Sequence, residues 1–366
     1  MCGIAGIYSY TNEVISKTIL KSMSDLMIHR GPDGDGFYSG HHIGLCHRRL
    51  KVIDLSAEAD QPFISENGRY VISFNGECYN YLELRTELEK DGHNFVTHSD
   101  TEVLVIGFSH WKEELFQKIN GMFAIAIWDN EKEELILARD RFGIKPLYIT
   151  TIEERLYFSS EIKPLLMQRK ETKLNYDSIY DYLTLRYVPT NKTLFNGVES
   201  LPPGEFLIIN KTGQKIKKYW SLNYKEPKSK FNKSDLSKLI SSSMKYRMRS
   251  DVKVGSYLSS GIDSSVIAYL AKQQGHILDT FTYDIKGQQS ELLMANKTAS
   301  DLGHRSHVVE EDELLKLKEI IESLEEPIGD SIILPTSFLS KKASSHVTVV
   351  LSGEGADEVF NGYAHH

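Results

Sequence analysis

The chain has 366 residues, of which 40% are hydrophobic and 25% are charged, so it can form the buried cores of two domains of ordinary size. Its net charge of −7 gives no electrostatic reason to expect nucleic acid as a partner. The three cysteines, Cys2, Cys46 and Cys78, are too few and too scattered for a disulfide framework or a zinc ribbon.

The start of the chain lacks the basic segment and the long apolar run of a secretory signal peptide. No stretch approaches the roughly 18 apolar residues that a membrane span requires. We therefore expect a soluble, cytoplasmic protein with no membrane partner.

The first half of the chain carries short strand-like runs rich in β-branched and aromatic residues, separated by Gly, Asn or Asp. These runs are residues 4–8, 43–45, 70–74, 124–128, 134–138, 147–151 and 156–159. Helical periodicity interrupts them at residues 15–29, 81–91 and 101–111. Because the strands do not alternate strictly with helices, the pattern predicts a layered α+β domain with largely antiparallel sheets.

Between about residues 186 and 233 the composition changes. Prolines punctuate the segment, and lysines recur toward its end. A phosphate-contacting patch is one interpretation, but a hairpin followed by a solvated linker is the simpler one. We therefore place a first domain with a peripheral hairpin region at residues 2–210, a Lys-rich linker at 211–233 and a second domain at 234–366.

In the second domain, strands and helices alternate along the chain. The pattern predicts helices at residues 234–248, 264–274, 290–302, 312–324 and 337–345. It predicts strands at residues 252–258, 278–285, 305–309 and 347–351. Such alternation is typical of an α/β domain in which helices cover both faces of a parallel sheet.

Cys2 is the first candidate for chemistry. A residue as small as cysteine at position 2 permits removal of Met1, and Cys2 then carries both a thiol and an α-amine. The amine, with an ordinary pKa of about 7.7–8.0, can act as a general base near neutral pH. The thiol is a strong nucleophile. Cys2 would thus need no catalytic histidine.

Three further segments carry groups suited to binding an amino acid. Arg49 is suited to a bidentate clamp on a carboxylate. The Asn75 side-chain amide and the Gly76 N–H group would form an oxyanion hole. Glu77 and Asp100 offer two anions for an ammonium group. A substrate with an α-carboxylate and an α-ammonium group is an amino acid.

This set of residues resembles the class II glutamine amidotransferases, whose glutaminase domain has the N-terminal-nucleophile fold. The resemblance covers residues 2–165 and includes the runs 121–129, 139–147 and 158–163. It implies that Cys2 is the nucleophile that strips ammonia from glutamine. The glutamine site that it implies consists of Arg49, Asn75, Gly76, Glu77 and Asp100.

The second candidate site is a serine-rich loop, Ser259-Ser260-Gly261-Ile262-Asp263-Ser264, between a predicted strand and a predicted helix. Backbone N–H groups and the helix dipole make such a loop an anion site. Asp263 would be out of place beside phosphate alone, but it fits a Mg²⁺ ion held between phosphate oxygens. A serine-capped helix after a turn is the competing interpretation, and the segment alone does not decide.

A second loop, Ser352-Gly353-Glu354-Gly355-Ala356-Asp357, also follows a strand. Two such loops fit the carboxyl edge of one parallel sheet, where Asp263 and Asp357 could share a magnesium ion. The loops are not a Walker A motif, because GxxxxGK[ST] is absent, and the third glycine of a dinucleotide fingerprint is missing.

The two loops resemble the pyrophosphatase-loop synthetase domain of the glutamine-hydrolysing asparagine synthetases. Residues 281–283, 325–330 and 334–336 add to the resemblance, whereas Ser260 stands where the family has the first of two adjacent glycines. The resemblance implies ATP and Mg²⁺ as cofactors, Glu354 near the activated acyl group, and a possible homodimer. The ATP site that it implies consists of Leu258, Ser259, Ser260, Gly261, Asp263, Ser264, Tyr283, Ser352 and Gly353, with Asp263 and Asp357 as metal ligands.

Three activities fit these motifs. The first is asparagine synthesis, in which aspartate is adenylated and ammonia from glutamine attacks it. The second is the same chemistry on another carboxylate, such as a peptide or a secondary-metabolite or cell-surface precursor. The third is a binding or regulatory protein without synthesis, which Ser260 would support. Because synthetase domains of the family usually extend further, we expect a C-terminally short second domain, either as a fragment or as a short member.

Overall fold

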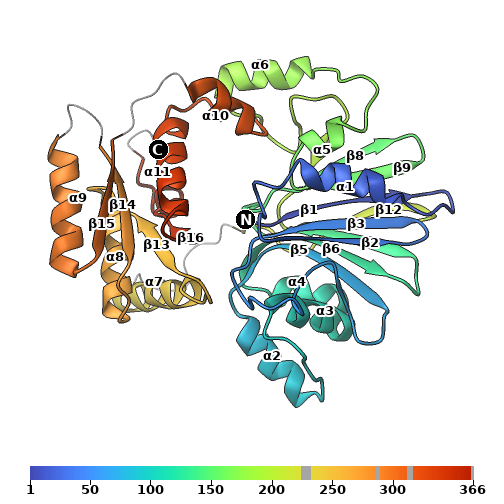
Figure 1. Ribbon diagram of the computed structural model, residues 1–366, viewed down its shortest axis with the longest axis horizontal. Helices are drawn as coiled ribbons and strands as arrows, with labels where there is room; N and C mark the ends of the chain where they lie inside the picture. Colours follow the sequence, from blue (N-terminus) through green and yellow to red (C-terminus); the bar gives the residue numbers. More distant parts are fainter. Residues whose placement is uncertain (224–231, 285–288, 311–315, 364–366) are drawn as a thin grey trace. The chain divides into compact units, whose positions relative to one another are not determined.

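The computed structural model describes residues 1–223, 232–284, 289–310 and 316–363 (Figure 1). The chain divides into two compact units. The first unit contains Met1–Lys225 and Glu325–Gly329, and the second contains Glu226–Leu324 and Asp330–His366. Within the described residues, we find no helix with the length and apolar character needed to cross a membrane.

The described part of the first unit contains two six-stranded sheets in which all strand pairs are antiparallel. One sheet has the order β10 (Glu199–Ser200), β8 (Tyr148–Ile152), β9 (Arg155–Ser159), β1 (Gly3–Ser9), β3 (Ile43–Arg49) and β2 (Gly34–Ser39). The other has the order β12 (Gly213–Lys218), β11 (Glu205–Asn210), β7 (Glu134–Arg139), β6 (Gly121–Asp129), β5 (Tyr70–Cys78) and β4 (Phe63–Ile64).

Helices cover the outer faces of both sheets, so the unit has four layers (Figure 1). The helices beside the first sheet are α1 (Lys17–Asp25) and α5 (Lys163–Leu166); those beside the second are α2 (Tyr81–Lys90), α3 (Asp100–Trp111), the 3₁₀ helix η1 (Lys112–Glu114) and α4 (Leu115–Lys118). Both faces of the sheets are apolar, as the alternation of side chains along β5 shows. Tyr70 and Ile72 pack toward the helices, whereas Val71 packs between the sheets. The predicted layered α+β fold is confirmed.

The structure differs from prediction at the end of the first unit. Residues 211–233, which we expected to form a Lys-rich linker, begin with β12, and Lys217 of this strand pairs with Phe206 of β11. Lysines on an edge strand hinder its pairing with other chains. An edge strand such as β12 can therefore have the Lys-rich composition that is also typical of a linker. The helix α6 (Tyr176–Leu185) was also not anticipated; its exposed tyrosines and leucines give no clear apolar stripe facing the core.

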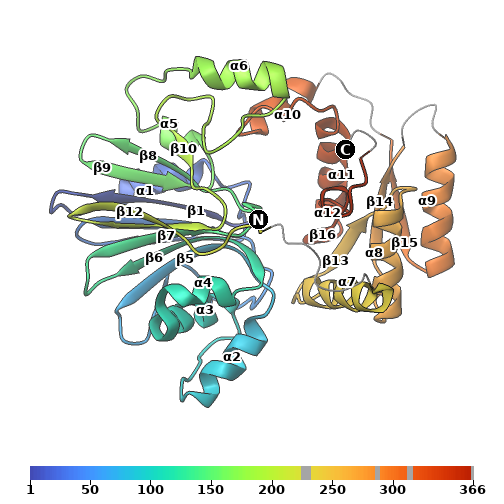
Figure 2. The ribbon, with the colours of Figure 1, turned by 180° about the vertical axis from the view of Figure 1, so that it is seen from behind.

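In the described part of the second unit, four parallel strands have the order β15 (Arg305–Val309), β14 (Asp279–Tyr283), β13 (Val254–Tyr257) and β16 (Val349–Leu351). The helices are α7 (Lys233–Arg247), α8 (Ile262–Gln273), α9 (Gln289–Leu302), α10 (Leu317–Ser323), α11 (Ile333–Ser344) and α12 (Ala356–Phe360). One face of the sheet carries α7, α8 and α9 and the other carries α11 (Figure 2). The predicted α/β domain is confirmed, although part of the helix expected at 312–324 lies outside the described residues.

The short segment Glu325–Gly329 returns to the first unit. The Glu325 carboxylate accepts hydrogen bonds from the backbone N–H groups of Ile162 and Lys163, and the Lys163 ammonium donates to it at 2.5 Å. The Gly329 N–H group donates to the Arg186 carbonyl at 3.2 Å. Glu325 thus satisfies free amides at the beginning of α5, which has no side-chain cap of its own. This segment falls inside the range that we predicted for the second domain.

Candidate active sites

Cys2 lies immediately before β1 and is half-buried. The Leu50 N–H group donates to the Cys2 sulfur at 3.4 Å, and Arg30 Nε donates to the Cys2 carbonyl at 3.0 Å. Burial raises the pKa of the Cys2 thiol, and the Leu50 hydrogen bond opposes this rise in part. The thiol is therefore neutral near pH 7 until a base takes its proton.

The amine at the amino terminus is a candidate for this base. Burial lowers the pKa of the Met1 amine to about 6; the charges of Cys2 and Glu77 oppose this shift, and those of Lys145 and Arg30 contribute to it. Removal of Met1 would move the free amine by one residue, about 3.8 Å along the chain, to Cys2. The surroundings that favour a neutral amine at Met1 therefore lie next to the amine that Cys2 would carry.

The two predicted ammonium ligands come together at the end of β5. Glu77 is in β5, and Asp100 opens α3, where its carboxylate accepts a hydrogen bond from the Cys78 N–H group at 3.0 Å. Burial, together with the charge of Asp100, raises the pKa of Glu77 well above its usual value. Burial also raises the pKa of Asp100 to about 6. A cationic ligand group beside this pair would relieve the cost of ionising both carboxylates.

The predicted oxyanion hole lies on the same strand. Asn75 is buried; its Nδ2 donates to Ser160 Oγ at 3.4 Å, while its Oδ1 has no hydrogen-bond partner among the described residues. A Cβ atom at Gly76 would lie 2.1 Å from the Met122 carbonyl oxygen. Only glycine at this position therefore allows β5 and β6 to pair here. The fold thus gives a steric reason for the glycine beside Asn75.

Arg49 is buried at the end of β3, but its guanidinium already has partners. It donates to the Ser56 carbonyl at 2.7 Å, to the Asp60 carboxylate and to the Asp54 carbonyl. The charge of Arg49 also lowers the pKa of Asp100, against the larger effect of burial. Its role as a clamp on the substrate carboxylate stays a prediction.

Two buried charged residues near the amino terminus, Glu161 and Lys145, had no predicted role. Glu161 is 3% exposed and accepts hydrogen bonds from Arg30 at 3.2 Å and from His29 at 2.7 Å. Lys145 is 5% exposed, and its Nζ lies 3.1 Å from the Met1 sulfur. Glu161 and Lys145 belong to the runs 158–163 and 139–147, which entered the sequence analysis only as part of the family resemblance. No pattern in a single sequence distinguishes a buried lysine from an exposed one at such a position.

In the second unit, the serine-rich loop connects β13 to α8. Gly261 caps the helix and offers no side-chain acceptor to its first N–H groups. Ser259 accepts a hydrogen bond from the Gly261 N–H group at 3.1 Å, and its own N–H group donates to Ser264 Oγ at 3.1 Å. The loop is therefore held by its own serines, while Ser260 and Gly261 are exposed and Asp263 is half-buried.

The second predicted loop meets the first. The strands β13 and β16 that precede the loops are parallel neighbours. A Cβ atom at Gly353 would lie 2.9 Å from the Asp263 Cβ atom, so the glycine permits direct contact between the loops. Asp357, in the first turn of α12, is half-buried, and Ser352 and Glu354 are exposed.

Two other predicted ATP-site residues lie at the carboxyl ends of neighbouring strands: Leu258 directly follows β13, and Tyr283 ends β14. The Leu258 N–H group donates to the Phe281 carbonyl at 3.0 Å, and Thr282 Oγ1 donates to the Leu258 carbonyl at 2.7 Å. The Tyr283 ring at the end of β14 stacks on Phe338. The described residues contain no group of three or more His, Cys, Asp or Glu side chains arranged for a metal ion. Magnesium at Asp263 would therefore need phosphate oxygens and water as further ligands, which is how it is commonly bound.

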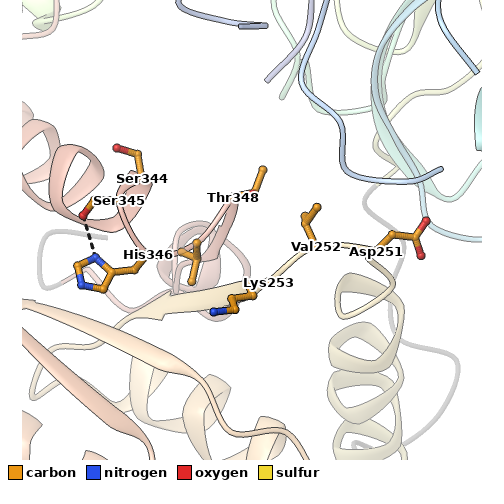
Figure 3. A pocket seen from close by; sticks show the side chains of 8 residues that line it. Asp251, Val252, Lys253, Ser344, Ser345, His346 and Thr348 are labelled. Carbon is orange, nitrogen blue, oxygen red and sulfur yellow. Dashed lines mark hydrogen bonds between the residues drawn. The ribbon is translucent and has the colours of Figure 1, made fainter. Parts of the chain in front are cut away.

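A pocket also lies at the opposite edge of the parallel sheet (Figure 3). It is lined by Asp251, Val252 and Lys253 before β13 and by residues 344–348 before β16. Ligands of open α/β sheets bind at the carboxyl ends of the strands, and this pocket lies at the amino ends. The loops at 259–264 and 352–357 are therefore the better candidate for a nucleotide site.

Comparison with known proteins gives matches over both units. A family model described as a glutamine amidotransferase domain matches residues 1–220, and one described as asparagine synthase matches residues 235–366. The chain is 40% identical over 99% of its length to glutamine-hydrolyzing asparagine synthetase 1 of Bacillus subtilis and 39% identical over 93% of its length to a putative asparagine synthetase of Mycobacterium bovis. It spans 59% and 56% of those two proteins. It is 33% identical over its whole length to a putative asparagine synthetase of Methanocaldococcus jannaschii, of which it spans 76%.

Proposed function

The chain belongs to the family of the glutamine-hydrolysing asparagine synthetases, and we propose that it transfers ammonia from glutamine to an ATP-activated carboxylate, that of aspartate. The observation that carries the proposal is the pair formed by half-buried Glu77 and buried Asp100 beside the amino terminus and Cys2. Two carboxylates with raised pKa values form a receptor for the ammonium group of an amino acid.

In the first unit, the proposed reaction is glutamine hydrolysis. The α-amine that Met1 removal frees on Cys2 takes the thiol proton, and the thiolate attacks the side-chain amide carbon of glutamine. Asn75 Nδ2 and the Gly76 N–H group stabilise the resulting oxyanion. The protonated amine then gives its proton to the leaving ammonia. Water hydrolyses the thioester to glutamate and restores Cys2.

In this reaction Glu77 and Asp100 hold the α-ammonium group of glutamine, and Arg49 holds its α-carboxylate. The existing contacts of Arg49 with Ser56 and Asp60 would then fix the direction of its guanidinium. Asp100 and Arg49 are buried, and the exclusion of water from them strengthens each charged contact.

In the second unit, we propose that ATP adenylates the acceptor. The first N–H groups of α8 and the serines at 259, 260 and 264 would bind the pyrophosphate, and Leu258 and Tyr283 would flank the adenosine. Asp263 and Asp357 would hold Mg²⁺, which neutralises charge on the phosphates. Ammonia attacks the acyl adenylate, and AMP leaves with the acyl oxygen that it carried. Glu354 would lie near the acyl group.

The test is an assay of pyrophosphate release and amide formation by the full chain with glutamine, ATP and a series of carboxylates. We expect release that depends on aspartate and yields asparagine. Release with a different carboxylate alone would replace aspartate as the acceptor. Glutamate release without pyrophosphate release for any carboxylate would overturn the synthetase half of the proposal.

A further inference from the structure

Lys145 is a buried cation that the proposed reaction does not yet use. It lies in the loop between β7 and β8, where its N–H group donates to Asp140 at 2.9 Å and its carbonyl accepts from Arg139 at 2.9 Å. The main-chain N–H and carbonyl groups of Lys145 are thus held by the side chains of Asp140 and Arg139. Its Nζ lies 3.1 Å from the Met1 sulfur. When Met1 is removed, this ammonium loses that contact and borders the space that Met1 leaves.

The charges around the amino terminus come from several elements. β5 contributes Glu77, α3 contributes Asp100, and the loop after α1 contributes Arg30, whose charge is shared with Glu161. Of the cations, Arg30 is tied to the Glu161 carboxylate and to the Cys2 carbonyl.

Within the part of the chain that the structure describes, the Lys145 ammonium forms no ion pair with a carboxylate; its contact is with the Met1 sulfur. Burial lowers the pKa of Lys145, but the charges of Glu77, Cys2 and Asp140 oppose this and favour the ammonium form. The charge of Lys145 in turn lowers the pKa of the amino terminus.

We propose that Lys145 is a positioning residue whose ammonium faces the α-amine of Cys2 after Met1 removal and keeps that amine in its neutral, proton-accepting form. The inference rests on the proposed glutaminase reaction. Its physical basis is that a fixed cation in a buried site disfavours a second cation beside it. Because the Cys2 amine stays neutral, it does not pair with the Glu77 and Asp100 carboxylates, and both can bind the ammonium group of glutamine.

The test is the pH dependence of kcat/KM for glutamate release by the full chain, because its acidic limb reports the base of the free enzyme. Lys145→Met removes the charge and keeps much of the length, and Lys145→Arg keeps the charge. Loss of the cation raises the pKa of the Cys2 amine, so a higher pH is needed to deprotonate that amine. We expect the acidic limb of Lys145→Met to move up by about half a pH unit or more, and that of Lys145→Arg to coincide with the wild type.

Lys112→Met is a matched control in the same unit. The Lys112 ammonium donates to the Tyr70 hydroxyl at 2.8 Å, away from the amino terminus, and the limb should stay in place. Mass spectrometry would confirm Met1 removal in each variant. An unmoved limb for Lys145→Met, or an equal movement for Lys145→Arg, would overturn the inference even if the rates fell.

A second measurement does not depend on turnover. The chain has three cysteines, so NMR signals of ¹³C-labelled cysteine are few, and the titration of the Cys2 amine can be followed directly. We expect a higher midpoint in Lys145→Met than in the wild type. An equal midpoint would contradict the role of Lys145. A wild type that titrates as expected but releases no glutamate would contradict the proposed glutaminase reaction instead.

Discussion

The two candidate sites are built in opposite ways. Around Cys2, charged side chains are buried: Asp100 is 5% exposed and already has a hydrogen-bond partner. In the loops of the second unit, Ser260, Gly261 and Glu354 are exposed, and Ile262 at the beginning of α8 is 80% exposed. The first site is preorganised for a small substrate, and charge is costly there. The second has open amides that a large anion would satisfy.

The most severe test of this contrast is Cys2→Ala. We expect glutamine-dependent amide formation to fall by about three orders of magnitude or more, because the nucleophile is lost. Synthesis with added ammonium salt should continue at the wild-type rate. The two rates are measured as amide formed with each nitrogen source. Loss of both would mean that the sites are not separate.

Asp263→Asn should affect the open site alone. We expect pyrophosphate release to fall about a hundredfold, because a magnesium ligand is replaced by a neutral group. Asp263 belongs to the second unit and is not one of the proposed glutamine-site residues, so glutamate release in the absence of ATP should not change. Pyrophosphate release at the wild-type rate would exclude Asp263 as a metal ligand.

Asp100→Asn should separate binding from stability at the buried site. The KM for glutamine should rise about tenfold or more, because an ammonium ligand is lost. The folded-state pKa of Asp100 is raised to about 6, so the stability associated with its protonated form is present below about pH 4 and is lost as the pH rises through 6.

The amide should therefore increase the free energy of unfolding at pH 7 by about 1–2 kcal/mol, with little change at pH 4. Urea unfolding at the two pH values measures this difference. Asp263→Asn, the same substitution in the second unit, serves as the comparison. If the Asp100→Asn variant were less stable than the wild type at pH 7, the ionised Asp100 carboxylate would be stabilising rather than destabilising.

The smallest expected effect is that of Gly353→Ala. The added methyl group would press on the Asp263 side chain at 2.9 Å, and the loops would have to separate slightly. We expect a few-fold rise in the KM for ATP with unchanged glutamate release. An unaltered KM would mean that contact between the loops does not position the nucleotide.

The sequence predicted elements well where periodicity was strong. The run 70–74 became β5, and 305–309 became β15 with the same bounds. It failed where composition is ambiguous: β12 has the lysines of a linker because it is an edge strand. The pairing of Glu77 with Asp100 could be foreseen from a substrate's needs, whereas the partners of Arg49 could not, since they depend on how residues 54–60 fold back.

Lys145 shows the same limit for the site. Its position between Ile144 and Pro146 says nothing about burial, and its importance follows from a neighbour 144 positions away along the chain, Met1. Such a contact exists only once both sheets have formed. Resemblance to a family can name the residues of a motif, but the electrostatic role of each comes from its surroundings.

The return of Glu325–Gly329 to the first unit has a consequence for how the protein can be divided. A cut at the Lys-rich region would give a fragment of residues 1–225 that lacks the carboxylate on the Ile162 and Lys163 amides. Those amides directly follow Glu161, the partner of Arg30, which holds the Cys2 carbonyl. The first unit is therefore not formed by one continuous stretch of the chain, and a fragment that ends at the Lys-rich region lacks the five residues Glu325–Gly329 that belong to it.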